Sequence, residues 1–96
     1  MNSSKRLCQQ ARQLLHKGAT LLDVRDPNEY QAGALPNAVN LPLRSMPMAL
    51  ERLANNKAYV IYCGTGMRSA RAREILQASG FNDVLDLGSY QTLQRC

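Results

Sequence analysis

The sequence lacks any long apolar run, and its first residues do not form a targeting segment. No apolar stretch approaches the roughly 18 residues that a membrane-spanning helix needs, so we expect no membrane span. Residues 1–18 carry charged side chains throughout and contain no continuous apolar segment, which does not match a secretory signal peptide. We therefore predict a cytoplasmic protein; a periplasmic location requires that a signal peptide once preceded Met1.

Cysteine pairs and metal-ligand clusters are also missing. The three cysteines, Cys8, Cys63 and Cys96, are an odd number and form no C-x-x-C pair, which argues against a disulfide framework and favours a reduced, cytoplasmic setting. The single histidine, His16, has no cysteine at metal-ligand spacing, so we expect no metal site and no cofactor. Cys8 and Cys96 lack any accompanying motif, and we interpret both as structural.

Aromatic side chains are scarce, at 5% of the 96 residues, although the formal net charge is +5. The basic residues are spread along the chain, and no basic run is interleaved with aromatic rings that stack on bases. Nucleic-acid binding is therefore the weakest function considered, since a basic balance suits small anionic substrates equally well. The 45% hydrophobic and 20% charged residues are typical of a globular chain, whose length fits one domain over residues 1–96.

Short apolar runs alternate with segments of helical periodicity, and no internal repeat is visible. Apolar strands of this kind, separated by helices, indicate an α/β fold with a parallel sheet covered by helices on both faces. The strands are expected at 20–24, 38–42, 58–62 and 83–87. The helices are expected from about Leu7 to a stop at Gly18, at 27–30, at 45–56, at 68–79 and from Tyr90 onward.

The stretch "YVIYCGTGMRSARAREIL" joins the clearest strand to the clearest helix through a cysteine loop. Cys63 lies at the carboxyl end of the strand, where ligands bind in such folds. Gly64 and Gly66 let the loop curve tightly, so that its N–H groups form an anion-binding nest beside the positive end of the helix dipole. Arg68, and less certainly Arg71, add positive charge. The loop therefore predicts an activated sulfur nucleophile with a pocket for an anion.

Two other interpretations of this loop remain open at this point. A buried cysteine at a strand end is often only structural, but the glycines, the arginine and the helix start favour function. Cysteine phosphatases use a C-x5-R loop, whereas four residues separate Cys63 from Arg68. Because each loop residue contributes one N–H group, the shorter loop suits a single extra sulfur atom better than a tetrahedral phosphate.

Two separated signatures resemble those of the rhodanese family, in the right order and at the right distance. The first is "LLDVRDPNEYQAGALPNAVNLPL", and the second is "VIYCGTGMRSARAREILQASGFNDVLDL", followed by "GSYQTL". The chain is similar in particular to the short single-domain sulfurtransferases of that family. The resemblance implies a rhodanese-like fold, with a central parallel sheet of four to five strands.

The resemblance also implies the chemistry of the loop. Cys63 would attack the outer sulfur of a donor such as thiosulfate, release sulfite and carry a persulfide, which implies ping-pong kinetics. A thiophilic acceptor, cyanide in the test tube, would then remove the sulfur. The backbone amides of the loop would stabilise the persulfide as preorganised hydrogen-bond donors. These amides belong to Gly64, Thr65, Gly66, Met67, Arg68 and Ser69.

Residues outside the loop that match the family pattern are assigned supporting roles. By resemblance, Asp23 and Arg25 form a charge pair beneath the loop, at the end of the first strand, and Glu29 is a partner for Arg25. Arg44 is expected to reach the pocket rim and attract an anionic donor. The stretch "AGALPNA" has Ala34 where the family commonly has histidine, a departure that leaves the nucleophile unaffected.

The leading functional hypothesis is a thiosulfate sulfurtransferase. The loop begins "CGTG", as in the mercaptopyruvate branch of the family, but Met67 and Arg68 make it more cationic and favour an inorganic dianion such as thiosulfate. The alternative is a persulfide carrier or sensor module that passes sulfur from Cys63 to a protein partner. A cysteine phosphatase or arsenate reductase ranks lower because of loop length. A thiol or a thioredoxin-like protein is the acceptor considered, and a monomer is expected.

Overall fold

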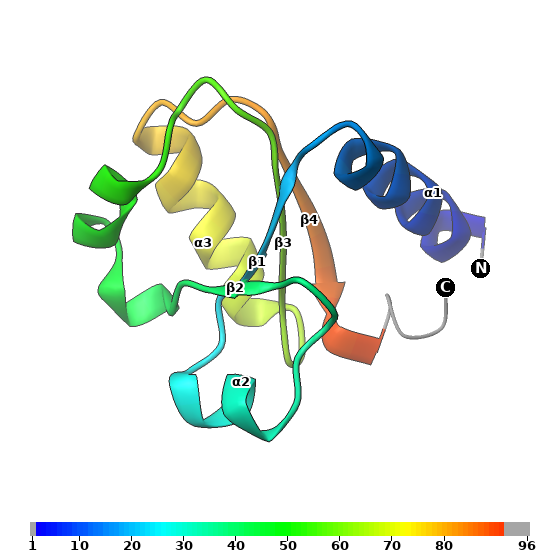
Figure 1. Ribbon diagram of the computed structural model, residues 1–96, viewed down its shortest axis with the longest axis horizontal. Helices are drawn as coiled ribbons and strands as arrows, with labels where there is room; N and C mark the ends of the chain where they lie inside the picture. The colour runs from blue at the N-terminus through cyan, green and yellow to red at the C-terminus, as the bar shows by residue number, and fades with distance from the viewer. Residues whose placement is uncertain (1, 92–96) are drawn as a thin grey trace.

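A computed structural model describes residues 2–91 and gives a four-stranded parallel sheet flanked by helices (Figure 1). The strands are β1 (Thr20–Asp23), β2 (Val39–Asn40), β3 (Tyr59–Cys63) and β4 (Val84–Ser89), in the order β2-β1-β3-β4. The helices are α1 (Asn2–His16), α2 (Pro27–Ala32), α3 (Met67–Ala78) and the short 3-10 helices η1 (Leu43–Ser45) and η2 (Met48–Arg52). The predicted α/β class and the expected four to five parallel strands are confirmed.

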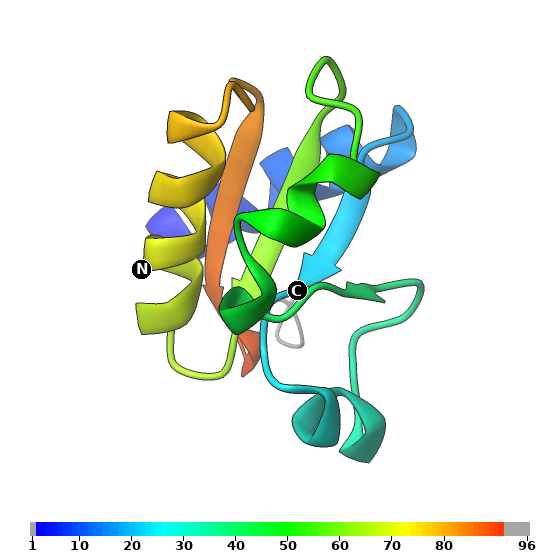
Figure 2. The ribbon, with the colours of Figure 1, turned by 90° about the vertical axis from the view of Figure 1, so that its left-hand side faces the viewer.

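Helices cover both faces of the sheet, as the apolar strands predicted. In Figure 2, α3 and η2 lie on one face and α1 lies behind the sheet on the other. All five residues of β3 are buried, and they alternate between the two faces. Tyr59, Ile61 and Cys63 belong to the core on the α3 side, whereas Val60 and Tyr62 belong to the core on the α1 side. The side chain of Cys63 therefore lies on the same face as α3.

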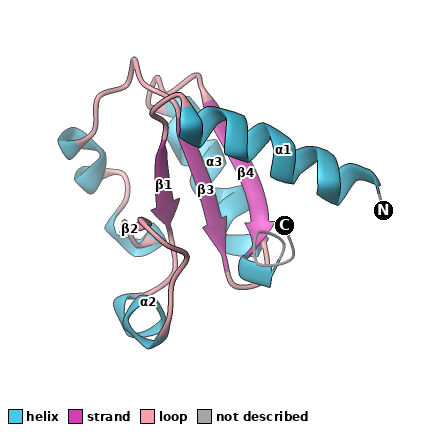
Figure 3. Cartoon of the chain, turned by 45° about the vertical axis from the view of Figure 1, so that its right-hand side comes forward, coloured by secondary structure: helices cyan, strands magenta, loops and turns pink. Residues whose placement is uncertain are grey.

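The first helix lies across one face of the sheet (Figure 3). It packs its apolar stripe against that face and ends where the sequence predicted. Ala11 is fully buried, and Leu7, Leu14 and Leu15 pack around it. The chain turns at Gly18, whose φ of 105° is in the left-handed region that glycine adopts without strain. The N–H of Gly18 donates to the carbonyl of Leu15 at 3.1 Å, which closes the helix end.

The expected helix over 45–56 is wrong in its bounds and type. Two 3-10 turns replace it, and the first begins earlier, at Leu43. Met46 interrupts them with an extended backbone, at ψ 150°, because a residue that precedes a proline disfavours the helical region and Pro47 follows it. The other expected elements are present within a few residues of their bounds. The expected helix from Tyr90 falls mostly on residues 92–96, which lie outside the described part of the chain.

The cysteine spacing led us to expect no disulfide, and this prediction is wrong for Cys8. Cys8 is disulfide-bonded, and Cys63 is the free cysteine of the described residues. The absence of a C-x-x-C pair excludes only a local bridge, because folding brings distant residues within disulfide distance. The prediction for Cys96 lies outside the described residues, and the cytoplasmic setting stays a prediction. Within residues 2–91, no helix is long and apolar enough to cross a membrane.

Candidate active site

The candidate nucleophile, Cys63, is the last residue of β3, at the carboxyl edge of the parallel sheet. Three residues connect it to α3 through the tight turn at the lower end of β3 in Figure 2. Cys63 has no solvent exposure, and its Sγ accepts a hydrogen bond of 2.9 Å from the N–H of Gly66. The loop therefore curls around the sulfur and directs a backbone donor at it, as the glycine pattern predicted.

The turn at Gly66 gives the loop this shape. Gly66 has φ 101° and ψ −15°, a left-handed conformation at the position just before α3 begins. Its carbonyl accepts hydrogen bonds from the N–H of Ala70 and the hydroxyl of Ser69, both at 3.2 Å. The same buried hydroxyl lies 3.5 Å from the carbonyl oxygen of Gly88 in β4. Ser69 thus ties the loop to the neighbouring strand.

The six loop residues that were predicted to bind the persulfide have different surroundings. Gly66 provides the amide that contacts Sγ among the described residues. The amides of Met67, Arg68 and Ser69 are the first of α3, and such amides have no carbonyl partner within their own helix. The side chains of Thr65 and Met67 face solvent, and Met67 is 80% exposed. The loop therefore directs the Gly66 N–H at the sulfur and leaves the side chains of Thr65 and Met67 exposed.

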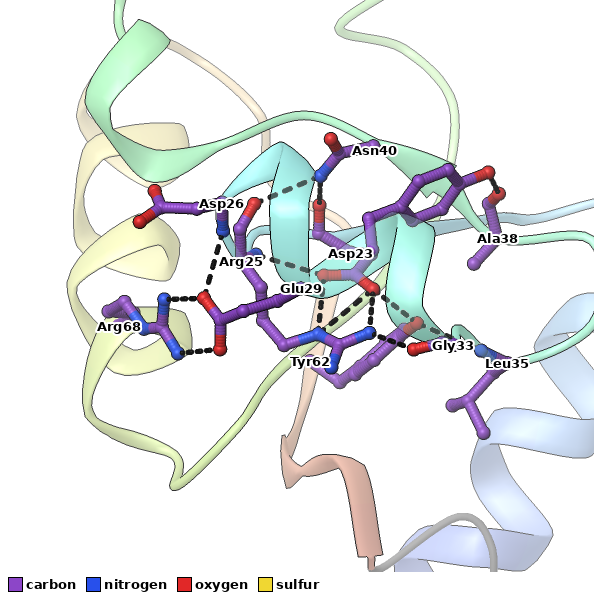
Figure 4. Close-up of polar contacts among 11 residues, drawn as sticks. Asp23, Arg25, Asp26, Glu29, Gly33, Leu35, Ala38, Asn40, Tyr62 and Arg68 are labelled. Carbon is purple, nitrogen blue, oxygen red and sulfur yellow. Dashed lines mark hydrogen bonds and ion pairs between the residues drawn. The ribbon is translucent and has the colours of Figure 1, made fainter.

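A bidentate ion pair between Glu29 and Arg68 lies beside the loop (Figure 4). The guanidinium nitrogens of Arg68 donate to the two carboxylate oxygens at 2.6 and 2.9 Å. This contact lowers the pKa of Glu29 to about 2 and raises the pKa of Arg68. A Cβ on Gly64 would lie 3.1 Å from the Arg68 Nη2, so glycine leaves room for the pair. Arg68 therefore adds no uncompensated positive charge to the loop, contrary to prediction.

The start of α2 orients Glu29 for this contact. Pro27 occupies the first turn of the helix, where its fixed φ is favourable. The N–H of Asp26 donates to the Oε1 of Glu29 at 3.2 Å, so the carboxylate is held from both sides. The prediction that Glu29 pairs with Arg25 is wrong. Sequence proximity favoured Arg25, but Arg25 is already engaged by a nearer carboxylate.

That carboxylate belongs to Asp23, which is fully buried next to Tyr62 of the adjacent strand. The Nη2 and Nε of Arg25 donate to Asp23 Oδ2 at 2.7 and 3.1 Å, and the Arg25 N–H donates to Oδ1 at 2.9 Å. The Tyr62 hydroxyl donates to Oδ2 at 2.7 Å. The hydrogen bonds that Arg25 donates to Asp23 raise the pKa of Arg25, and burial is the main cause of the raised pKa of Tyr62. The predicted charge pair of Asp23 and Arg25 is present.

The network around Asp23 holds the segments that follow β1 (Figure 4). Arg25 also donates to the carbonyl of Gly33 at 2.7 Å, and its guanidinium carbon lies 4.7 Å from the ring centre of Tyr90. The side-chain amide of Asn40 donates to the carbonyls of Asp23 and Arg25, each at 2.9 Å. These contacts join the end of β1 to β2, to Gly33 after α2, and to Tyr90 directly after β4.

Tyr62 is a buried neighbour of Cys63 whose place in this network sequence reasoning missed. Its hydroxyl bridges Asp23 and the N–H of Leu35, from which it accepts a hydrogen bond of 3.1 Å. Because Tyr62 directly precedes Cys63, any shift of this tyrosine moves the nucleophile. When β1 and β3 are aligned as parallel neighbours, Asp23 lies opposite Tyr62. The matching positions of these two residues near the ends of their strands were the signal available in the sequence.

The two remaining candidates lie away from the sulfur. The side chain of Arg44 is 72% exposed and its Nε lies 3.9 Å from Asp26 Oδ1. Arg71 is 66% exposed and pairs with Glu74 on the same helix at 3.2 Å. Among the described residues, neither side chain has a hydrogen bond or ion pair with Cys63 or with residues 64–66. Over the same part of the chain, no group of three or more His, Cys, Asp or Glu side chains is arranged to hold a metal ion.

Comparisons with known proteins identify the family to which this fold belongs. A family model described as "Rhodanese-like domain" matches residues 7–95. The "Sulfurtransferase" of Allochromatium vinosum is 36% identical over 67 residues, which are 70% of this chain and 63% of that protein. The "Thiosulfate sulfurtransferase GlpE" of Pseudomonas syringae pv. syringae is 34% identical over 76 residues, 79% of this chain and 72% of that protein. The solved structure of the human single-domain sulfurtransferase TSTD1 matches with a TM-score of 0.76 at 25% identity, over 91% of each chain.

The extent of these matches differs between relatives. The chain spans 57% to 63% of the length of three curated relatives, among them YqhL of Bacillus subtilis. The family model, in contrast, covers almost the whole chain, including both signatures and the loop around Cys63. On this match, the chain belongs to the family of rhodanese-like domains.

Proposed function

We propose that the protein is a thiosulfate sulfurtransferase that carries sulfur as a persulfide on Cys63. The observation that carries the proposal is the 2.9 Å hydrogen bond from the Gly66 N–H to the Cys63 Sγ, at the carboxyl end of a buried strand and the start of a helix. Two relatives with the printed name thiosulfate sulfurtransferase, one in Pseudomonas syringae and one in Escherichia coli, support the choice of donor.

In the first half-reaction, the Cys63 thiolate attacks the outer sulfur of thiosulfate. A bond forms between Sγ and that sulfur, and the sulfur–sulfur bond of thiosulfate breaks. The electron pair of the broken bond leaves with sulfite. The negative charge moves to the outer sulfur of the persulfide, where the loop amides and the first turn of α3 stabilise it. These donors are fixed before the reaction, so no reorganisation is needed as the charge moves.

In the second half-reaction, a nucleophilic acceptor attacks the outer sulfur of the persulfide. With cyanide, a carbon–sulfur bond forms, the persulfide bond breaks, and thiocyanate leaves while the Cys63 thiolate is restored. A thiol acceptor would take the same sulfur as its own persulfide. Cys63 is the free cysteine of the described residues, so an external acceptor completes the cycle. Sulfite leaves before the acceptor reacts, which is ping-pong behaviour.

The decisive experiment compares thiocyanate formation from thiosulfate and cyanide by wild type and by Cys63→Ala and Cys63→Ser. We expect turnover in the wild type with parallel double-reciprocal lines, and no enzymatic thiocyanate from either variant. Circular dichroism and thermal unfolding establish that both variants are folded. Wild-type turnover in Cys63→Ala would overturn the mechanism, and intersecting lines would overturn the persulfide intermediate.

One observation favours the persulfide carrier as a second candidate function. Met67 is 80% exposed next to the loop, and Glu29 neutralises the arginine that would attract thiosulfate. An exposed methionine is an adaptable apolar contact for a protein partner. A carrier would therefore show slow turnover with thiosulfate and cyanide but fast transfer to a protein thiol. Met67→Gln, which removes the apolar contact without adding charge, would slow transfer to thioredoxin and leave transfer to cyanide unchanged, whereas equal effects on both acceptors would argue against the carrier.

A further inference from the structure

The amide that points at the sulfur of Cys63 lies against the end of β4. A Cβ added to Gly66 would lie 3.7 Å from the Cα of Gly88, so the loop and this strand meet backbone to backbone. The buried hydroxyl of Ser69 lies 3.2 Å from the carbonyl oxygen of Gly66 and 3.5 Å from that of Gly88. The path of β4 at Gly88 therefore helps to fix the position of the Gly66 N–H.

This part of β4 contains one residue more than the strand beside it. Ile61 of β3 pairs with Asp86, whereas the next residue of β3 pairs with Gly88, so Leu87 is the extra residue of a bulge. Bulges bend a strand and are frequent next to active sites. Gly88 has φ 82°, in the left-handed region that glycine adopts without strain. The bulge and this glycine together set the course of β4 where the loop contacts it.

The carboxylate of Asp86 holds the bulge in this shape. Its Oδ1 accepts a hydrogen bond of 2.8 Å from the N–H of Gly88. Aspartate and asparagine side chains readily form such a bond with the backbone two residues further on. Among the described residues, β4 is an edge strand of the sheet, beside α3 in Figure 2, so a neighbouring strand supports it on one side only. The side chain of Asp86 supplies a constraint that a second neighbouring strand would otherwise provide.

The place of Asp86 in the sheet also argues for this role. Leu85 and Leu87 on either side of it belong to the core on the α1 side, so by strand alternation Asp86 faces the side that carries Cys63 and α3. Its partner in the register, Ile61, is fully buried in that core. A polar group that is half-buried at such a position costs free energy unless a hydrogen bond compensates it. The bond to the bulge is that compensation.

We propose that Asp86 is a positioning residue for the nucleophile, which acts through Gly88 to hold the Gly66 N–H at the Cys63 sulfur. This role rests on the proposed function, because the same amide stabilises the thiolate and the persulfide that would form on it. A donor that is fixed before the charge develops stabilises an anion without any cost of reorganisation. Asp86 contributes this preorganisation from the neighbouring strand.

Two substitutions at Asp86 separate geometry from charge. Asp86→Asn removes the charge but keeps an acceptor oxygen two residues before Gly88, whereas Asp86→Glu keeps the charge and moves the carboxylate away from this local bond. The measurement is a pH titration of the Cys63 thiolate by its ultraviolet absorbance, from which the same variant in a Cys63→Ser background is subtracted. The charged pair of Glu29 and Arg68 beside the loop is the same in every variant.

We expect Asp86→Glu to raise the midpoint of this titration by about one pH unit and to lower kcat for thiocyanate formation about tenfold, as for a weakened hydrogen bond to an anion. Asp86→Asn should match the wild type in both. Asp86→Ala should raise the midpoint as well, although loss of the charge alone would lower it. Asp83→Glu, the same change at an exposed residue just before β4, is the matched control and should have no effect.

A lower midpoint in Asp86→Asn with no change in Asp86→Glu would mean that charge acts and geometry does not, and would overturn the proposal. So would unchanged or equally shifted midpoints in these two variants, or an equal shift in Asp83→Glu. Circular dichroism and thermal unfolding record any loss of stability, which by itself leaves the midpoint where it is. The titration needs no sulfur donor, so it decides the role of Asp86 even if the wild type fails to transfer sulfur and the proposed function is refuted.

Discussion

Asp23→Asn removes a buried charge, and its effect on stability can be worked out in detail from the structure. The carboxylate is fully buried and accepts hydrogen bonds from the backbone and guanidinium of Arg25 and from the hydroxyl of Tyr62, at 2.7–3.1 Å. Asp23→Asn keeps the shape of the side chain but replaces an acceptor by an NH2 donor that faces other donors. It also leaves the buried guanidinium without its counter-charge.

The size of the loss follows from these contacts. Removing one partner of a buried ion pair costs about 3–5 kcal/mol, because the remaining charge stays desolvated. A domain of this length has a free energy of unfolding of about 5–15 kcal/mol, and each kcal/mol shifts Tm by about 4–8 °C. Asp23→Asn should therefore lower Tm by at least about 12 °C. The same change at Asp26, whose side chain is 54% exposed, should alter stability by less than about 0.5 kcal/mol.

Urea unfolding at neutral pH, followed by circular dichroism, measures both variants under the same conditions. A double-mutant cycle with Arg25→Gln adds a second criterion, since both changes remove the same interaction and their combined cost should be well below the sum. The reasoning is refuted if Asp23→Asn costs no more than Asp26→Asn, or if the costs of Asp23→Asn and Arg25→Gln simply add.

Three further predictions concern the loop and its ion pair. The pKa of Glu29 is about 2 in the folded protein, below its ordinary 4.5. The Glu29–Arg68 pair therefore stabilises the fold above pH 4.5, and this stabilisation is lost as the pH falls towards 2. Because both side chains are partly exposed, we expect the wild type to lose about 1 kcal/mol of unfolding free energy over this range, a loss that Glu29→Gln does not show. Equal acid sensitivity in urea titrations would contradict this. In sulfur transfer, Glu29→Gln should lower the KM for thiosulfate by freeing the Arg68 cation, and Arg68→Ala should raise it; shifts in the same direction would refute the charge argument. Gly66→Ala forces a side chain into φ 101° and should reduce both kcat and stability, by about 1–2 kcal/mol for the latter, whereas Gly18→Ala, at φ 105°, should affect stability alone. Equal loss of kcat in both glycine variants would refute the local role of Gly66.

The nucleophile and its strand were predictable because their signals are local. The apolar run before Cys63 is continuous since both faces of β3 are buried, and the glycines mark the turn that brings an amide to the sulfur. The helix start directly after the loop added a third local signal. These features depend on residues close in sequence, so they can be recognised without knowing the order of the strands in the sheet.

The ion-pair partners were not predictable in the same way. Glu29 and Arg68 are 39 residues apart, and they meet because the strand order β2-β1-β3-β4 places the end of β1 beside the end of β3. From sequence alone, Arg25 was the nearer partner for Glu29. The role of Tyr62 was missed for the same reason, since its contact with Asp23 depends on strand register. The two 3-10 turns, in contrast, had a local signal that the prediction did not use, because Pro47 disfavours the helical region at Met46.

The most direct test of the central claim is the mass of the protein after brief exposure to thiosulfate, with peptide mapping of the added sulfur. We predict one extra sulfur atom on the peptide that contains Cys63, its loss on addition of cyanide with release of an equal amount of thiocyanate, and no adduct in Cys63→Ser. Thiocyanate formation without any sulfur on Cys63, or an unchanged adduct in Cys63→Ser, would contradict the account.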